Sequence, residues 1–322
     1  MSDAARAEQS WWVRLGPFRY LLPALLIIVP FRLVPILYAF GVSFTDWNMG
    51  GFQRWVMLDN YRNLLADPLF WQSLLNTLWY VLGTVPTTLF LSLGAAMLLN
   101  RKLRARGFYR TLYYLPVVTS MVAISMVWKW IFHPRVGLAN YLLGMIGVDP
   151  LSWLEEPRGI LTVMLERIGF DAPAWMGGPS LALCAIMITG IWKGLGYNIV
   201  IFLTGLQNIP ESYYEAARID GAGPWHQFRS VTWGLLSPTT FYVLLMSTIV
   251  SFQVFGQIYM MTTPPGGPLG ATNVIVFFLY QKGFTGLFRS GDASAVAFIL
   301  FVIILALTLI QRRYGEARVH YQ

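Results

Sequence analysis

Apolar residues along this chain gather into six long runs that are separated by polar segments. A helix needs roughly 20 consecutive apolar residues to cross the hydrocarbon core of a bilayer, and the runs are close to that length or longer. They span residues 20–44, 72–99, 108–132, 181–206, 239–260 and 293–310. The pattern therefore predicts an all-α integral membrane protein with six transmembrane helices.

The same pattern divides the chain into a membrane domain and two short ends. Residues 20–313 form the predicted membrane domain, between an N-terminal segment at 1–19 and a tail at 314–322. An apolar, aromatic stretch at 273–288 is short for a span and is typical of an interfacial or re-entrant segment. No small-residue cleavage site follows the first run, so we expect this run to be retained as a span.

Composition agrees with a membrane protein and argues against several other classes. Hydrophobic residues make up 56% of the 322 residues and charged residues only 12%, whereas a soluble chain of this length would need more charge. The single cysteine, Cys184, excludes a disulfide framework. Neither a metal-ligand pattern nor a hydrolytic triad surrounds the histidines, so no metal site and no enzyme are predicted; the histidines are His133, His226 and His320.

The distribution of charge predicts how the chain crosses the membrane. The net charge is +8, but no basic stripe interleaved with exposed aromatic residues points to nucleic acid. Segments on the N-terminal side of the six spans hold 13 lysines and arginines and 6 acids, while segments on the other side hold 7 and 9. Because basic loops stay in the cytoplasm, both termini are predicted to be cytoplasmic, as are the basic loop 100–110 and the polar segment 208–238.

The polar segment 208–238 is predicted to form a short helix, a turn and a second helix. Pro210 suits a first helical position, and Gly221 suits the position that ends a helix. A second helix is expected at 225–235. One face of the first helix combines polar residues with two alanines that allow another surface to approach closely; its members are Tyr213, Ala216, Ala217 and Asp220.

Three basic residues fall inside predicted spans, where an uncompensated charge is costly. Arg32 lies between two prolines and is expected to bind backbone carbonyls that the prolines leave free, rather than substrate. Lys129 lies between two tryptophans and is expected to extend toward the membrane surface. Lys193 has two open interpretations: with Asn198 it faces a polar pathway, or it forms an interhelical hydrogen bond.

The fifth predicted span carries a row of polar residues. Gln253 and Gln257 are four residues apart and are predicted to share one face of a helix. Such a row lines the path of a hydroxyl-rich substrate or bonds to a neighbouring helix, and the first is favoured slightly. The predicted pathway residues are Lys193, Asn198, Ser251, Gln253 and Gln257.

The loop at 133–180 contains an internal sequence repeat, in which residues 22 positions apart match. Its first copy comprises Leu143, Ile146, Gly147, Asp149, Trp153 and Pro157, and its second copy comprises Leu165, Ile168, Gly169, Asp171, Trp175 and Pro179. The repeat predicts a small duplicated helix-and-turn element, and we hypothesise that it enlarges an outer platform for a partner protein.

Several motifs together resemble those of the inner-membrane permease subunits of binding-protein-dependent ABC importers, in the carbohydrate-uptake group that includes maltose-type and glycerol-phosphate-type permeases. Glu215, Ala216, Ala217 and Gly221 match the spacing of the family's cytoplasmic Glu-Ala-Ala signature, although Trp233 and Gly234 stand where the signature ends in Leu-Pro. The resemblance also covers FYRTLYYLP, SFQVFGQIYMMT and GDASAVAFILF, and so most of 18–313. Many relatives carry an acid where Gly256 stands.

The resemblance implies a type I ABC importer permease fold, with a cytoplasmic coupling helix between spans four and five. The implied coupling residues are Glu215, Ala216, Ala217, Asp220 and Gly221. The chain lacks a GxxxxGK[ST] phosphate loop, so ATP and Mg²⁺ are expected on two separate ATPase subunits and no cofactor is expected on this chain. A second homologous permease and an extracytoplasmic binding protein are the other implied partners, in a bacterial or archaeal cytoplasmic membrane.

The implied substrate is a sugar or oligosaccharide, with glycerol 3-phosphate or a related polyol phosphate as the alternative. A self-contained ion-coupled transporter is the alternative of a different class. It would need acids within the spans or inverted repeats, but all 15 acids lie in predicted loops or tails.

Overall fold

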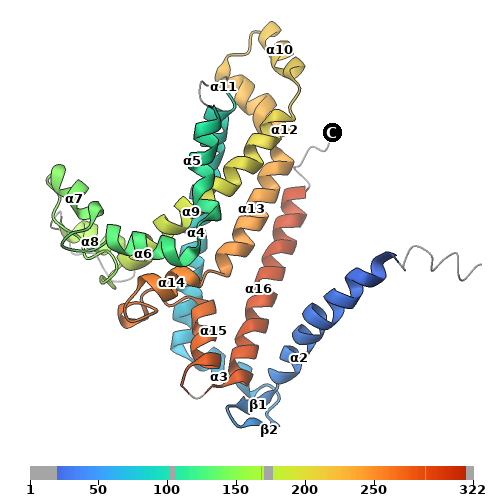
Figure 1. Cartoon of the computed structure of the whole chain (residues 1–322), viewed down its shortest axis with the longest axis vertical. Helices are drawn as coiled ribbons and strands as arrows, with labels where there is room; N and C mark the ends of the chain where they lie inside the picture. The colour runs from blue at the N-terminus through green and yellow to red at the C-terminus, as the bar shows by residue number, and fades with distance from the viewer. Residues whose placement is uncertain (1–19, 102–105, 168, 170–176, 287, 317–322) are drawn as a thin grey trace, which may run out of the picture. The chain divides into compact units, whose positions relative to one another are not determined.

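The structure is a computed structural model that describes residues 20–101, 106–167, 169, 177–286 and 288–316. Helices dominate these residues, and the strands among them form a two-stranded sheet (Figure 1). The chain divides into two compact units, each considered by itself: Met1–Leu64 with Gln281–Phe298, and Leu65–Tyr280 with Ile299–Gln322.

The first unit contains an apolar helix at Tyr20–Val42 and a hairpin. A π-helical turn, η1 (Val29–Leu33), precedes α2 (Val34–Val42) where two prolines remove backbone donors. Arg32 lies in this turn, but its guanidinium donates no hydrogen bond to any described residue, so the expected contact with freed carbonyls is not formed there.

A tight packing contact closes the hairpin of the first unit. Its strands β1 (Thr45–Asn48) and β2 (Gly51–Trp55) are antiparallel, and α3 (Asp59–Ala66) follows them. The Asn60 amide donates to the carbonyls of Ser43 and Thr45, at 2.9 Å each. A Cβ on Gly291 would collide with the Thr45 carbonyl, so only glycine permits this approach.

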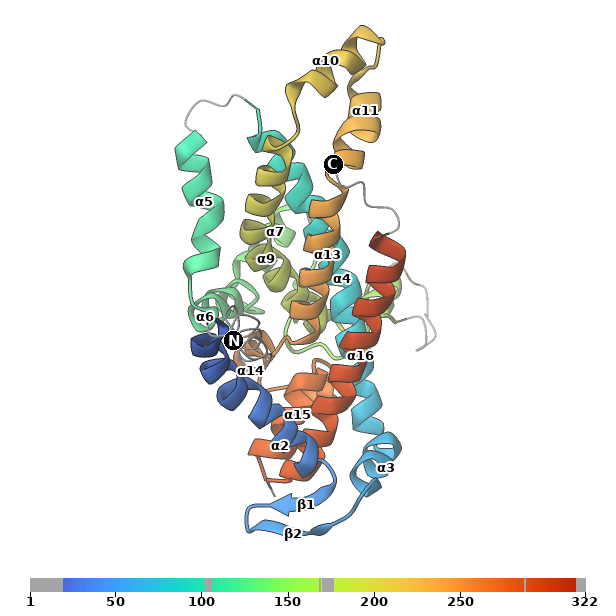
Figure 2. The same ribbon diagram turned by 90° about the vertical axis from the view of Figure 1, so that its right-hand side faces the viewer.

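The core of the second unit is built on two long helices, α4 (Pro68–Leu99) and α9 (Leu181–Gln207). The helix α13 (Ser237–Phe252) runs beside them (Figure 2). The buried face of α4 carries hydroxyl groups that bond to carbonyls of their own helix, as Thr84 does with the Tyr80 carbonyl at 2.6 Å. This bonding lets polar side chains lie within an otherwise apolar core.

Two of the predicted spans are interrupted. The run at 108–132 forms α5 (Arg106–Val118) and α6 (Met121–Ile131), which meet at 101°. The run at 239–260 is helical only to Phe252, and α14 (Gly256–Met261) follows after a break. The segment Pro224–Leu235 meets α13 at 66°. Among the described residues, four helices are long and apolar enough to cross a membrane, and the number rises to as many as six if each bent pair counts as one span.

The helices of the C-terminal part agree with the elements predicted there. The stretch at 273–288 contains α15 (Ile275–Phe284), which is short for a span, after the 3₁₀ turn η4 (Pro268–Gly270). The last helix, α16 (Ser290–Glu316), contains the final long apolar segment, Ser290–Arg313.

The 133–180 loop contains two helices that end in the same way. Gly147 follows α7 (Leu138–Met145) with φ +77°, and Gly169 follows α8 (Ile160–Arg167) with φ +81°. Each glycine N–H donates to the carbonyl three residues earlier, at 3.1 Å and 3.0 Å. This common cap supports the predicted duplication, although Ile168, Asp171 and Trp175 of the second copy lie outside the described residues.

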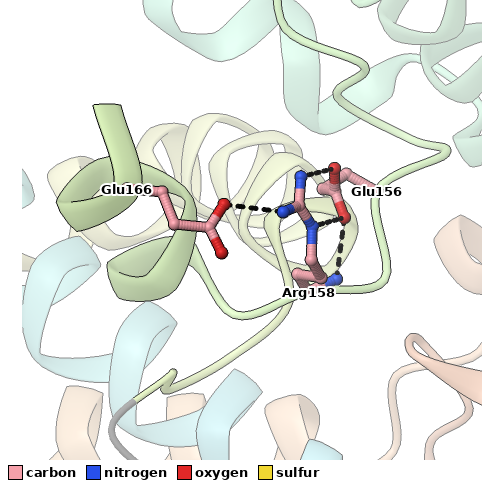
Figure 3. A network of polar contacts seen from close by, with 3 residues as sticks. All are labelled: Glu156, Arg158 and Glu166. Carbon is pink, nitrogen blue, oxygen red and sulfur yellow. Dashed lines mark hydrogen bonds and ion pairs between the residues drawn. The ribbon is translucent and has the colours of Figure 1, made fainter. Parts of the chain in front are cut away.

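An ion-pair network fixes α8 to the segment that precedes it (Figure 3). The Arg158 guanidinium lies 2.9 Å from the Glu156 carboxylate and 2.7 Å from the Glu166 carboxylate. The hydrogen bond from Arg158 holds the pKa of the Glu156 carboxyl below its ordinary value. Because Arg158 is half exposed, the network contributes mainly to the position of α8 and little to stability.

Candidate functional site

A cavity of about 450 Å³ lies within the second unit, among α4, α9, α13 and α14. It brings together all the residues predicted to line a substrate pathway: Lys193, Asn198, Ser251, Gln253 and Gln257. The lining contains one cation and no acid among the described residues. Apart from this cation, the polar groups of the lining are mainly hydroxyls and amides, which lie among apolar side chains.

Lys193 stabilises the bend between α5 and α6. Its ammonium donates to the carbonyls of Pro116, at 3.0 Å, and Thr119, at 2.9 Å. These carbonyls lie at the C-terminal end of α5, where a helix lacks donors of its own and favours a cation. The interhelical hydrogen bond is therefore formed, while Lys193 also borders the cavity.

Asn198 and Ser251 contact other helices across the cavity wall. The Asn198 amide donates to the Ser247 hydroxyl at 3.2 Å, which links α9 to α13. The Ser251 hydroxyl lies 3.4 Å from that of Thr84 on α4. These groups hold three helices around the cavity and already have protein partners.

Gln253 and Gln257 do not share one helix, so the prediction of a common helical face is wrong. Phe255 lies between them with φ −144° and ψ −55°, which breaks the helix and places Gln257 in α14. Both side chains still line the cavity. Neither amide has a hydrogen-bond partner among the described residues, so both can bond to a ligand.

Tyr80 also lines the cavity, although the sequence pattern did not predict this role for it. It is one aromatic residue in a long apolar run and resembles the many aromatic residues that anchor helices at membrane surfaces. A signal was nevertheless present, because Tyr80, Thr84 and Thr88 recur at four-residue spacing and so share one face of α4.

The polar segment 208–238 forms the predicted helix, turn and second helix. The first helix is α10 (Glu211–Ile219), and it lies beyond the ends of α9 and α13 (Figures 1 and 2). Pro210 has ψ 136° and is the N-cap, not the predicted first helical residue. Gly221 has φ +77°, as a helix-ending glycine requires.

The hydrogen bonds after α10 form a Schellman motif. The Gly221 N–H donates to the Arg218 carbonyl at 3.1 Å, and the Ala222 N–H donates to the Ala217 carbonyl at 2.8 Å. The turn opens a groove of about 520 Å³, whose lining includes Ala216, Ala217, Asp220 and Gly221. A shallow surface with small side chains is thus available to a partner.

Glu215 is exposed beside this groove. Its ion pair with Arg218, the simplest local alternative to a partner contact, is not formed, because Arg218 bonds to Glu211 at 2.9 Å. Ile219 and Trp225 are 86% and 72% exposed. Large apolar side chains next to a carboxylate without an ion-pair partner among the described residues are typical of a protein interface.

The second helix is irregular, and it contains Trp233 and Gly234, which stand where the Glu-Ala-Ala signature ends in Leu-Pro. It comprises α11 (Pro224–Gln227), a π-helical turn η3 (Phe228–Thr232) and α12 (Trp233–Leu235). The Tyr214 and Thr232 hydroxyls lie 3.0 Å apart and join it to α10. The helix–turn–helix unit is therefore held together despite the altered ending.

No group of three metal-binding side chains lies close enough to hold a metal ion among the residues whose structure is described.

Comparisons with known proteins place the chain in a family. A family described as binding-protein-dependent transport system inner membrane component matches residues 88–318. The chain is 34% identical to an sn-glycerol-3-phosphate transport system permease protein of Brucella abortus, which covers 96% of this chain and 97% of that one. It is 31% identical to a lactose transport system permease protein of Rhizobium radiobacter, which covers 97% of both chains.

Solved structures share the fold. A bacterial ABC transporter involved in the import of the acidic polysaccharide alginate aligns with a TM-score of 0.74 over 96% of this chain and 99% of that one, at 21% identity. At this identity the alignment shows that the overall fold is shared. The chain is a member of the family of inner-membrane components of binding-protein-dependent transport systems, and it is a multi-pass transport subunit and not an enzyme.

Proposed function

We propose that this chain forms, with a second homologous permease, the transmembrane pathway for a sugar or oligosaccharide in an ATP-driven importer. The observation that carries the proposal is the cavity. Among the described residues its lining offers amide and hydroxyl groups, no acid and one cation, which is engaged by two carbonyls. Such a lining suits a neutral ligand rich in hydroxyl groups. The similarity to a lactose permease supports this substrate class.

Glycerol 3-phosphate or a related polyol phosphate is the second candidate substrate. The similarity to an sn-glycerol-3-phosphate permease favours it. A phosphate in the cavity would need a cation, and Lys193 would have to leave the Pro116 and Thr119 carbonyls to supply one. The neutral substrate requires no such rearrangement and is therefore preferred.

Two separate ATPase subunits, which bind ATP and Mg²⁺, are proposed to drive the chain through α10. The residues proposed to make this contact are Glu215, Ala216, Ala217, Asp220 and Gly221. Exposure of Glu215, the groove beside the alanines and the exposed Ile219 support an interface here. An extracytoplasmic binding protein would deliver the solute, and the 133–180 loop is proposed as part of its platform.

Both termini and α10 are proposed to lie in the cytoplasm, as the excess of basic residues on that side requires. Single cysteines are to be introduced at Ser212 in α10 and at Ser152 in the 133–180 loop, in a Cys184→Ala background. A membrane-impermeant maleimide added to intact cells is expected to label position 152 and to spare position 212 until the membrane is opened. The reverse pattern would contradict this topology.

The proposed function predicts which solute accelerates ATP hydrolysis. The chain is to be reconstituted in liposomes with its cognate permease, ATPase and binding protein, and supplied with neutral mono-, di- and trisaccharides or with sn-glycerol 3-phosphate. A neutral sugar is expected to stimulate hydrolysis severalfold and to accumulate. Stimulation by the phosphate ester alone would favour the second candidate, and uptake that persists without the ATPase subunits would favour an ion-coupled transporter.

A further inference from the structure

Tyr80 is a buried tyrosine whose hydroxyl borders the cavity without a hydrogen-bond partner. Only 3% of the residue is exposed, and the cavity lining includes it. No hydrogen bond to Tyr80 Oη is formed within the described part of the chain, and this oxygen opens onto the cavity and is not sealed in the core. A phenol hydroxyl is both donor and acceptor. The Tyr80 hydroxyl can therefore bond to a ligand that enters the cavity, which phenylalanine at this position could not do.

The backbone of α9 leaves room for this hydroxyl at one position. A Cβ added at Gly190 would collide with Tyr80 Oη, so the hydroxyl occupies the space that any other residue at 190 would fill. The same Cβ position lies 3.7 Å from Gln257 Nε2. The Tyr80 hydroxyl and the Gln257 amide thus converge beside Gly190, and neither is bonded to the other in the described structure.

Several polar groups of the cavity already have protein partners, unlike the hydroxyl of Tyr80 and the side-chain amides of Gln253 and Gln257. Thr84 donates to the Tyr80 carbonyl at 2.6 Å, and Asn198 donates to Ser247 at 3.2 Å. Lys193 is engaged by two carbonyls. A ligand that enters the cavity therefore meets the Tyr80 hydroxyl with its full bonding capacity available.

We propose that Tyr80 binds a hydroxyl group of the transported sugar through its own hydroxyl, and that Gly190 is required for Tyr80 to reach that position. This inference rests on the proposed function and names a residue that determines which sugar is accepted. A site that offers a buried hydroxyl to a substrate hydroxyl discriminates against an analogue that lacks the group, because the protein hydroxyl is then left unpaired.

The test compares Tyr80→Phe with the unaltered chain in the complete importer, in nanodiscs, trapped with vanadate after transfer of a radiolabelled sugar from the binding protein. The probe is the neutral mono-, di- or trisaccharide that best stimulates ATP hydrolysis, and its monodeoxy derivatives. Loss of one ordinary hydrogen bond is expected to make release of the sugar from the trapped complex about fivefold faster. The unaltered importer is expected to reject one monodeoxy derivative, and Tyr80→Phe to accept it as well as the parent sugar.

Gly190→Ala provides an independent test of the geometry. In the unaltered chain the new methyl group is expected to displace the Tyr80 hydroxyl and to speed release at least as much as Tyr80→Phe does. In the Tyr80→Phe background the colliding oxygen is absent, so Gly190→Ala is expected to raise the rate of sugar release by less than twofold. Tyr113→Phe, which removes the hydroxyl of a half-buried tyrosine that does not line the cavity, is the matched control.

The outcomes separate this inference from the function on which it rests. Release and deoxy-sugar selectivity that are unchanged in Tyr80→Phe would overturn the role of Tyr80 and leave the sugar importer intact. Equal effects of Gly190→Ala in both backgrounds would overturn the role of Gly190. If no neutral sugar stimulated the unaltered importer, the proposed substrate class would fall, and the assignment of Tyr80 with it.

Discussion

Replacing Gly221 by valine is expected to abolish solute-stimulated ATP hydrolysis while the chain still inserts into the membrane. Gly221 has φ +77°, in the left-handed region that a β-branched residue avoids at a cost of about 1–2 kcal/mol or more. The structure leaves nothing within 4 Å of a Cβ at this position, so the chain itself would not be crowded. Damage is therefore expected in the turn and in the contact with the ATPase.

Gly234→Val is the matched control for this prediction. Gly234 lies in α12, in the same polar segment, and a Cβ there also has nothing within 4 Å. Because its backbone is helical, valine brings no left-handed strain. Stimulated hydrolysis is to be measured in proteoliposomes with both variants. If Gly221→Val keeps more than half of the stimulation, α10 and its turn do not couple the chain to an ATPase.

Replacing Lys193 by methionine is expected to destabilise the α5–α6 bend. Two hydrogen bonds from an ammonium group are lost, and the carbonyls of Pro116 and Thr119 remain at a helix end without their donor. The unfolding free energy is expected to fall by about 2 kcal/mol, a figure that allows for the partial exposure of the side chain. Thermal unfolding of the complex in nanodiscs measures the loss, and Lys193→Arg, which can donate to both carbonyls, should restore most of it.

The same variant also tests the choice between substrates. If Lys193 only supports the bend, Lys193→Met should reduce uptake of every solute to a similar extent. If only the uptake of sn-glycerol 3-phosphate is reduced and thermal stability is unchanged, Lys193 binds the phosphate and its contacts with the carbonyls are dispensable.

Local signals in the sequence predicted the helix–turn–helix shape of segment 208–238 well, because this shape depends on backbone preferences. Glycine is the residue that tolerates positive φ, so Gly221 could be assigned to the end of α10 before the turn was seen. Gly147 and Gly169, which occupy matching positions of the predicted repeat, both have positive φ as well. Pro210 was misplaced by one position because both the N-cap and the first helical residue accept its fixed φ.

The arrangement of the cavity was harder to predict because contacts between helices decide it. The sequence selected Gln253 and Gln257 on the assumption of a continuous helix, yet they meet at the cavity through a break at Phe255. It could not decide whether Lys193 bonds to another helix, since the carbonyl acceptors lie more than 70 residues away in the chain. Tyr80 was missed because its importance depends on Gly190 in another helix.

The sequence by itself determined the membrane class, the apolar segments, the helix–turn–helix shape of segment 208–238 and the resemblance to importer permeases. The reason is that hydrophobicity, charge and turn chemistry act over a few neighbouring residues. Only the tertiary structure decided where two of those segments break, which polar groups are already bonded, and which remain available in the cavity. Hydrogen bonding between helices depends on distances that no local pattern encodes. The availability of Tyr80, Gln253 and Gln257 to a ligand is therefore a property of the packed bundle.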